Sequence, residues 1–281
     1  MSVEVTEQVG NDRHTSRVLP VKPVRLIATD LDGTLLRSDG TISARTAQTL
    51  RAARGRGLRV VAVTARPPRT VTQLGPLAEL VDGAICVNGA LLIEAPSARV
   101  VDSSPIPVPI VRAAATMLRE VVGEVNFAVE TGWEVMAEQG WRYHADRHAA
   151  TPGLEEVLGV DDPVLKLLAH CPGRDVNELL TVARAAGLPD VEVCHSGGPG
   201  LLEISAAGVT KAGALARYCA ANGIASDEVV AFGDMPNDAP MLQWAGRSFA
   251  MAGAHPEAVA AATDRTGAND EDGVAMVVEG L

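Results

Sequence analysis

Two aspartates, one residue apart, follow directly on an apolar run near the start of the chain. The stretch "RLIATDLDGTLL", residues 25–36, places Asp30 and Asp32 at this point. Asp-Gly pairs are common in turns and aspartates cap helices, so this motif alone fits a turn equally well. It does not fit a calcium loop of the EF-hand type, because Leu35 stands where that loop needs glycine. Two carboxylates this close repel unless a cation faces them or one is protonated, so the pair favours a hard-cation site with a carboxylate nucleophile.

A further carboxylate ends a second apolar run. In "GDMPND", residues 233–238, Asp234 supplies the third oxygen ligand that a Mg²⁺-type site needs. Asn237 and Asp238 follow it, although helix capping explains either of them, taken singly, equally well. The predicted metal ligands are Asp30, Asp32, Asp234 and Asp238.

Thr64 and Lys211 are candidate site residues because of where they stand in the sequence. Thr64 ends the β-branched run "RVVAVT" and Lys211 begins a predicted helix. Taken alone, the threonine fits an ordinary strand and the lysine fits a solvated surface. At one edge of a sheet, however, a hydroxyl and an ammonium can bind the oxygens of a phosphoryl group. Arg66 follows two residues after Thr64, where it could reach a substrate or simply be exposed.

These residues can form one site only in a fold that brings the ends of their strands together. A strand–helix rhythm at both ends of the chain predicts a parallel sheet with right-handed crossovers, and such sheets bind ligands at the carboxyl ends of their strands. The predicted strands are 25–29, 59–64, 83–88, 228–234 and 248–254. The predicted helices are 43–56, 67–80, 209–222 and 256–262.

The middle of the chain has a different rhythm, in which a helix and then two antiparallel strands occur twice. The predicted helices are 110–122 and 175–186, and the predicted strands are 126–130, 133–138, 164–171, 191–195 and 201–205. We therefore predict a Rossmann-like α/β core with an inserted α+β domain. The expected boundaries are a flexible tail at 1–22, a core at 23–90 and 207–281, and an inserted domain at 91–206.

Composition limits the classes of function. The chain has 281 residues, a net charge of −11 and 3% aromatic residues, which argues against nucleic acid as a partner. It shows no signal-peptide pattern and no apolar run of membrane-spanning length, and its four cysteines form no C-x-x-C pair. Buried thiols in a reducing cytoplasm are the expectation. His144, His148 and His195 lack the spacing of metal ligands and are predicted to lie at the surface.

The motifs taken together resemble those of a known family. "DLDGTLL", "VTAR", "GDMPND" and the lysine of "GVTKAGAL" resemble the four motifs of the haloacid dehalogenase (HAD) superfamily, whose phosphatase branch carries D-x-D-G-T. "VNGA", "LEISAAGVTKAGAL" and "NDEDGVA" further resemble the Cof-type subfamily, which has a C2-type α/β cap inserted after the third strand. The resemblance extends over nearly the whole chain from residue 24, although in the cap it covers the layout only.

The resemblance implies a Mg²⁺-dependent phosphomonoester hydrolase that acts through an aspartyl-phosphate. Asp30 would be the nucleophile and Asp32 the general acid and base. Mg²⁺ would be held by Asp30, Asp234 and the backbone carbonyl of Asp32, with Asp238 close by as a partner of Lys211. The implied catalytic residues are Asp30, Asp32, Thr64 and Lys211. The implied substrate-binding residues are Thr64, Arg66, Asn88, Gly89, Lys211 and Asn237, although a simple turn explains Asn88 and Gly89 equally well.

Two alternatives remain open at this stage. A phosphosugar mutase of the same superfamily would need a second phosphate site, and Arg142, Arg147 and Arg174 are the only arginines between residues 120 and 180. A non-catalytic binding or regulatory protein could also use the fold. The expected partner is a small phosphorylated metabolite, such as a sugar phosphate, with no nucleic acid and no membrane. The expected assembly is a monomer or a weak homo-oligomer.

Overall fold

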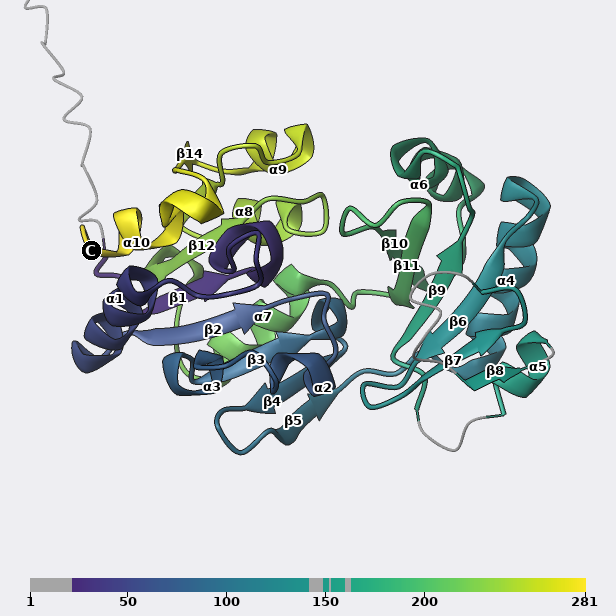
Figure 1. Cartoon of the computed structure of the whole chain (residues 1–281), viewed down its shortest axis with the longest axis horizontal. Helices are drawn as coiled ribbons and strands as arrows, with labels where there is room; N and C mark the ends of the chain where they lie inside the picture. The colour runs from purple at the N-terminus through teal and green to yellow at the C-terminus, as the bar shows by residue number, and fades with distance from the viewer. Residues whose placement is uncertain (1–21, 142–148, 152, 160–162) are drawn as a thin grey trace, which may run out of the picture.

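The computed structural model describes residues 22–141, 149–151, 153–159 and 163–281. The predicted tail at 1–22 lies outside these residues except for Lys22. The described chain forms two sheets, each with its own helices, side by side along the long axis of the molecule (Figure 1). Within the described part, no helix is long and apolar enough to cross a membrane.

The larger sheet has eight strands in the order β14-β13-β12-β1-β2-β3-β4-β5. Its parallel strands are β1 (Leu26–Thr29), β2 (Arg59–Val63), β3 (Gly83–Cys86), β12 (Val229–Gly233), β13 (Arg247–Ala250) and β14 (Asp264–Arg265). The central strand β1 pairs in parallel with β12 on one side and β2 on the other, with Leu26 opposite both Val229 and Arg59. The predicted parallel core is therefore confirmed, and the strands end at a common edge.

Helices cover both faces of this sheet. Alternate residues of β1 face opposite sides, as side chains do along any strand. Ile27 packs into the apolar cluster that contains residues of α1 (Ala44–Gly55), α3 (Leu77–Leu80) and α10 (Gly273–Val278). Its neighbours Leu26 and Ala28 pack into the cluster of α7 (Lys211–Ala221), α8 (Ala239–Trp244) and α9 (Pro256–Ala261). Helix α1 begins as predicted, because the hydroxyl of Ser43 accepts from the backbone N–H of Thr46.

Two predictions about the core are corrected. The single helix expected over 67–80 is two short helices, α2 (Pro68–Val71) and α3, because Gly75 at φ +45° and Pro76 interrupt the helical pattern. The inserted domain does not begin at residue 91. Strand β4 (Leu91–Glu94) pairs antiparallel with β3, and β5 (Arg99–Ser103) pairs antiparallel with β4, so both extend the larger sheet. The insertion therefore starts after Ser103.

The smaller sheet forms the inserted domain, called the cap from here on. Its strand order is β10-β11-β9-β6-β7-β8. The strands are β6 (Asn126–Glu130), β7 (Val135–Glu138), β8 (Ala149–Thr151), β9 (Lys166–His170), β10 (Val191–Cys194) and β11 (Leu201–Ala206). As predicted, each long cap helix precedes an antiparallel pair of strands: α4 (Val108–Val122) precedes β6 and β7, and α6 (Val176–Ala186) precedes β10 and β11. The third cap helix is the short α5 (Leu154–Val157).

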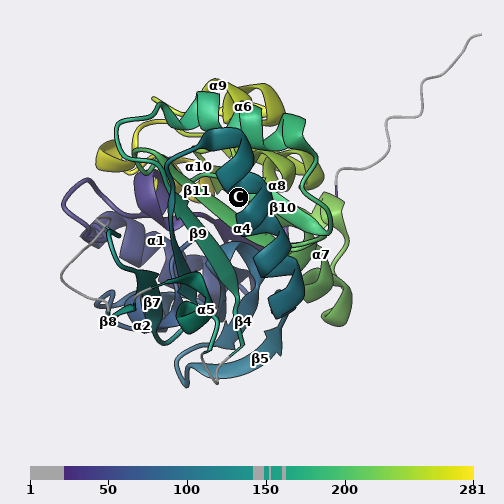
Figure 2. The same cartoon turned by 90° about the vertical axis from the view of Figure 1, so that its right-hand side faces the viewer.

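The two faces of the cap sheet differ in chemistry. On β9, Leu167 and Ala169 pack into the apolar cluster under α4 and α6, whereas Lys166 and Leu168 line a cavity on the opposite face. Figure 2 looks onto the helix-covered face, with α4 in front of the sheet. The uncovered face is therefore the one that is turned toward the core.

Candidate active site

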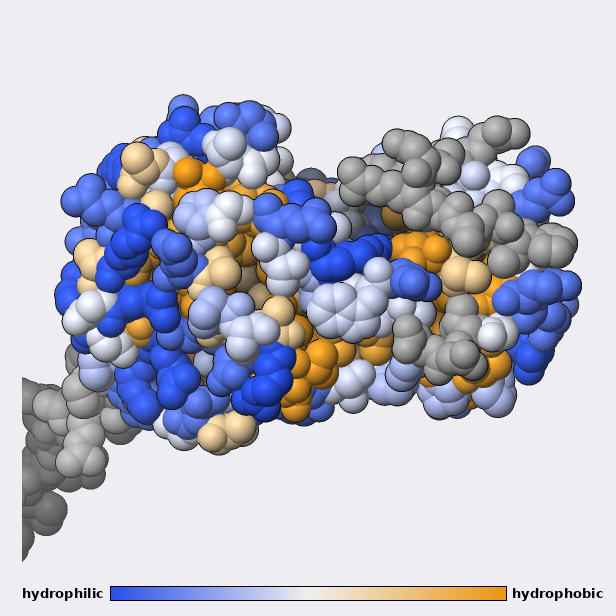
Figure 3. Space-filling model, turned by 60° about the horizontal axis from the view of Figure 1, so that its bottom comes forward, coloured by the Kyte–Doolittle hydropathy of each residue, from blue (hydrophilic) through white to orange (hydrophobic). Residues whose placement is uncertain are grey.

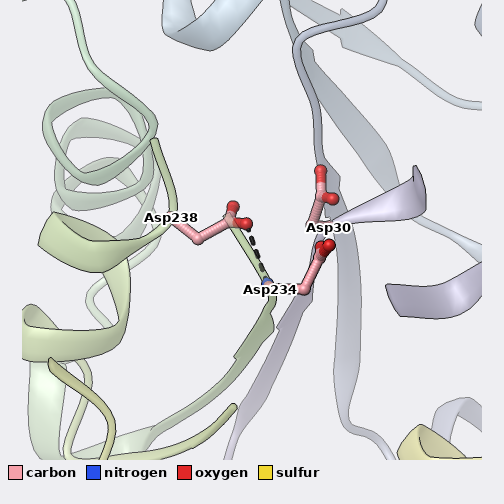
Figure 4. Close-up of side chains that lie close together, drawn as sticks. All are labelled: Asp30, Asp234 and Asp238. Carbon is pink, nitrogen blue, oxygen red and sulfur yellow. Dashed lines mark hydrogen bonds between the residues drawn. The ribbon is translucent and has the colours of Figure 1, made fainter. Parts of the chain in front are cut away.

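Three carboxylates from two neighbouring strands meet at the carboxyl edge of the larger sheet. Asp30 directly follows β1 and Asp234 directly follows β12, so the parallel pairing of these strands brings the two residues together. One oxygen each of Asp30, Asp234 and Asp238 lies within 4.8 Å of the others (Figure 4). Such a set of hard oxygen donors fits a divalent cation.

Lys211 is the cation that faces this cluster. Its Nζ donates to Oδ1 of Asp30 and to Oδ1 of Asp238, at 2.7 Å in each case, and all three side chains are buried. Burial alone would lower the pKa of Lys211, but the carboxylates of Asp238 and Asp30 outweigh it and raise the pKa. For Asp30, burial dominates and raises the pKa well above its usual range, although Lys211 opposes this effect.

Asp234 is held by the loop that contains the first aspartates. Thr34 Oγ1 donates to Asp234 Oδ1 at 2.9 Å, a role that the sequence did not reveal. Burial, reinforced by the charge of Asp238, raises the pKa of Asp234 to about 6. Gly33 has φ +73°, and a Cβ on it would lie 2.4 Å from Asp234 Oδ2. The Asp-Gly turn therefore leaves the space that the third carboxylate occupies.

Asp238 organises the loop after β12. Its Oδ2 accepts from the backbone N–H groups of Asp234 and Met235 at 3.0 Å each, while its Oδ1 accepts from Lys211. The side chain is fully buried. Both of its oxygens are therefore already engaged, as a partner of Lys211 would be, and its predicted role as a direct metal ligand stays a prediction.

Asp32 lies apart from the cluster. Arg66 grips its carboxylate with two hydrogen bonds, of 2.7 Å from Nε and 2.6 Å from a terminal nitrogen, and 58% of the Asp32 side chain is exposed. Thr64 is fully buried at the end of β2, where its Oγ1 accepts from the backbone N–H of Arg66 at 3.1 Å. The structure thus brings Asp32, Thr64 and Arg66 to one side of the acidic cluster.

A cavity of about 1000 Å³ lies between the cap and the core. Six of the predicted site residues line it, namely Asp30, Asp32, Thr64, Arg66, Lys211 and Asn237. Asn237 is 7% exposed and its Oδ1 has no hydrogen-bond partner, so a polar group is available to a bound molecule. The cavity is large enough for a phosphorylated metabolite.

Asn88 and Gly89 are not among the residues that line this cavity. Asn88 instead joins the two domains, because its Nδ2 donates to Oε2 of Glu203 at 2.9 Å and its Oδ1 accepts from Asn237 at 3.1 Å. Gly89 permits close packing, since a Cβ there would lie 2.4 Å from the carbonyl oxygen of Thr210. In this structure both residues support the site without facing the cavity.

The sequence reasoning missed the polar residues that the cap contributes. Lys166 and Glu203 form a buried ion pair, and Lys166 Nζ also donates to the carbonyl of Ala65 at 3.0 Å. Arg69 of the core binds Glu130 of the cap through two hydrogen bonds. One feature of the sequence could have indicated these residues: each of the apolar strands "VLKLLAHC", "LLEIS" and "NFAVE" contains a single charged residue.

One histidine prediction is wrong. His195 was expected at the surface but is 1% exposed, and its Nε2 lies 3.1 Å from Oδ1 of Asn177. The ring of His255, from the core, lies edge-on to the His195 ring with 6.0 Å between the ring centroids, a contact between domains that the spacing of histidines in the sequence cannot show. His144 and His148 lie outside the described residues.

Known proteins match this chain over most of its length. It is 29% identical to the 5-amino-6-(5-phospho-D-ribitylamino)uracil phosphatase YitU of Bacillus subtilis, over 90% of this chain and 96% of the relative. It is 27% identical to the pyridoxal phosphate phosphatase YbhA of Escherichia coli, over 90% and 97% respectively. A solved HAD subclass IIB sugar phosphatase superposes with a TM-score of 0.74 at 25% identity, over 92% of this chain and 98% of that one.

The family model of the haloacid dehalogenase-like hydrolases matches residues 27–278, which include both domains and every residue of the acidic cluster. The match agrees with the order of motifs in the sequence, with the parallel core and with the inserted α+β cap. The resemblance seen in the sequence is thereby confirmed, and the chain belongs to the haloacid dehalogenase-like hydrolases.

Proposed function

We propose that this phosphatase hydrolyses phosphomonoesters of small metabolites through an aspartyl-phosphate on Asp30, with Mg²⁺ as its metal. The observation that carries the proposal is the placement of Asp30. Its carboxylate lies at the wall of the cavity, within the acidic cluster, and Lys211 holds one of its two oxygens. The other oxygen is free of this contact and can attack a phosphorus atom.

The reaction would proceed in two displacements. An oxygen of Asp30 attacks phosphorus in line, the bond to the leaving alcohol breaks, and Asp32 donates a proton to that alcohol. A water then attacks the phosphorus of the aspartyl-phosphate, Asp32 takes its proton, and phosphate leaves. Thr64 and Lys211 would donate hydrogen bonds to phosphoryl oxygens as their negative charge develops.

Proton transfer by Asp32 has a condition. Both of its oxygens accept from Arg66, so at least one of these hydrogen bonds must break before Asp32 can reach the leaving group. The phosphoryl oxygens of a substrate are the natural competitors for the guanidinium. As the substrate binds, Arg66 would exchange a hydrogen bond to Asp32 for one to a phosphoryl oxygen of the substrate.

The metal fits the residues present. Asp30 and Asp234, with the backbone carbonyl of Asp32, would hold it, and burial without a cation accounts for the raised pKa values of both carboxylates. When bound, Mg²⁺ supplies neutralisation of negative charge on the phosphoryl group and on Asp30. One ammonium, that of Lys211, cannot balance the charge of the three carboxylates of the acidic cluster.

The relatives support the class of substrate. Their names specify a ribitylaminouracil phosphate, pyridoxal phosphate and sugar phosphates, all of which are small phosphorylated metabolites. Nothing supports the mutase alternative. Arg142 and Arg147 lie outside the described residues, and Arg174 donates to the carbonyl of Val122 and is not among the residues that line the cavity. We also propose a cytoplasmic location, which the four unpaired thiols support. For the assembly we propose a monomer or a weak homo-oligomer.

Release of inorganic phosphate tests the proposal. We expect release from p-nitrophenyl phosphate, and from a panel of sugar, cofactor and nucleotide monophosphates, in the presence of Mg²⁺, and loss of this activity in EDTA that excess Mg²⁺ restores. A mutase would give an isomer and little phosphate. If no member of the panel releases phosphate with Mg²⁺, the proposal is wrong and the non-catalytic alternative gains.

Stability should respond to Mg²⁺ in a pH-dependent manner. The pKa of Asp234 rises from 3.8 to about 6 on folding, so the metal-free folded state holds this proton more tightly than the unfolded chain. The stability that this group contributes is therefore present below pH 4 and is lost as the pH rises toward 6. Mg²⁺ replaces the proton, so we expect saturating Mg²⁺ to raise Tm by roughly 5 °C at pH 7.5 and by much less at pH 5.

Thermal unfolding in EDTA and in Mg²⁺ at the two pH values measures this difference. Asp234→Asn is the control, because it removes both a titrating group and a ligand, so it should weaken the effect of Mg²⁺ on Tm and reduce its dependence on pH. An equal rise of Tm at both pH values would contradict the assignment of Asp234 to the metal.

A further inference from the structure

Every cation that lines the cavity, among the described residues, already has a carboxylate partner. The four pairs are Arg66 with Asp32, Arg69 with Glu130, Lys166 with Glu203, and Lys211 with Asp30 and Asp238. The first and last belong to the phosphoryl end of the cavity. The other two lie where the leaving group of a substrate would extend toward the cap.

The two pairs on the cap side are fixed by further hydrogen bonds. Glu203 is 3% exposed and also accepts from Asn88 and Ser196. Glu130 is 4% exposed and accepts the backbone N–H of Gly132 at 2.7 Å in addition to both bonds from Arg69. Separation of either pair would leave a buried carboxylate without its cation, which is costly. These cations are therefore not available to a second anion.

The rest of the cap wall offers no cation among the described residues. Glu134 adds a fifth carboxylate to a lining that has four basic side chains. Apolar side chains make up much of the remaining wall, namely Trp133, Met136, Trp141, Leu168 and Leu201. Figure 3 shows hydrophobic residues on the cap next to its junction with the core. This wall can bury the uncharged surface of a substrate at a small desolvation cost.

We infer that the cap selects phosphomonoesters whose leaving group carries no negative charge of its own, and that Glu130 and Glu203 set this selectivity. A carboxylate or a second phosphate in the leaving group would lose its water beside these glutamates and gain no free cation from the described part of the wall. The inference rests on the proposed function and specifies its substrate class.

Matched substrates test the inference, because each pair differs by one anionic group. We would compare kcat/KM for glycerol 1-phosphate with 3-phosphoglycerate, for glucose 1-phosphate with glucuronate 1-phosphate, and for phenyl phosphate with 4-carboxyphenyl phosphate. We expect the anionic member to be poorer by roughly 10-fold or more in each pair. Equal values would overturn the inference and leave the proposed function standing. No phosphate from any of the six would refute both.

A change of charge in the cap gives a second test. Glu130→Gln keeps the shape of the side chain and frees Arg69, so kcat/KM for the anionic members should rise by roughly 10-fold relative to their neutral partners. Glu203→Gln should shift the ratio in the same direction through Lys166. A merely structural role would lower both members together and leave the ratio unchanged, which would overturn the assignment of these glutamates.

The matched control is Glu155→Gln. Glu155 also binds an arginine, Arg112, through two hydrogen bonds of 2.7 Å, but it is exposed on the cap and does not line the cavity. Its substitution should leave the ratio of anionic to neutral substrates unchanged. If Glu155→Gln altered the ratio as much as Glu130→Gln does, the effect would reflect the net charge of the protein and the inference would fail.

Discussion

Asp30→Asn is expected to lower kcat for phosphate release by roughly three orders of magnitude or more. The amide keeps the size of the side chain but lacks the charged oxygen that attacks phosphorus in the proposed mechanism. The variant should fold, because burial raises the pKa of Asp30 and a neutral amide removes the cost of burying its charge, while Lys211 keeps Asp238 as its partner. Acid quenching of the wild type during turnover should trap a covalent phosphoenzyme, and Asp30→Asn should form none.

The control for this substitution is Asp82→Asn. Asp82 accepts from the backbone of Val60 and from Arg54, away from the cavity, so its loss affects packing at the opposite end of the sheet. Phosphate release should persist in Asp82→Asn. Activity of Asp30→Asn within tenfold of the wild type, with the fold intact, would rule out Asp30 as the nucleophile.

Lys211→Met is expected to affect stability as well as activity. The substitution removes the ammonium between Asp30 and Asp238 and leaves two buried carboxylates with no cation between them. Loss of one partner from a buried ion pair costs about 3–5 kcal/mol of unfolding free energy. Phosphate release should fall by roughly 10²-fold or more, since the proposed mechanism has Lys211 donate to a phosphoryl oxygen. Denaturant unfolding and steady-state kinetics measure the two effects.

Lys22→Met is the matched control, because Lys22 pairs with Asp227 at the surface and both side chains are more than half exposed. It should change neither quantity measurably. Adding Asp238→Asn to Lys211→Met removes one stranded carboxylate and should restore part of the lost stability. A Lys211→Met protein as stable as the wild type would show that the buried charges are balanced by other means.

The position of the acidic cluster could be predicted because it depends on local pattern and on one rule of topology. Asp30 and Asp234 each end a short apolar run, and parallel strands deliver their carboxyl ends to one edge. That β1 and β12 are direct neighbours made the two carboxylates meet. The predicted partnership of Lys211 with Asp238 was also confirmed, since a buried cation is needed beside so many carboxylates.

The cap side of the cavity could not be predicted in the same way. Lys166 and Glu203 are 37 positions apart, and Arg69 and Glu130 belong to different domains, so only the assembled fold pairs them. The boundary of the insertion was misplaced for a related reason. Strand β4 pairs with β3 and β5 pairs with β4, and this ladder of hydrogen bonds assigns both strands to the core.

The contacts that cross the junction beside the cavity have a consequence for exchange of reactants and products. Asn88 reaches Glu203, Lys166 reaches the carbonyl of Ala65, and Arg69 reaches Glu130. When the cap and the core part as whole bodies, water reaches both partners of each contact and replaces the lost hydrogen bonds, so no charge is left unpaired in a dry interior. Separation of the domains therefore costs less than loss of one partner inside the closed cavity, and this border is where solvent can enter.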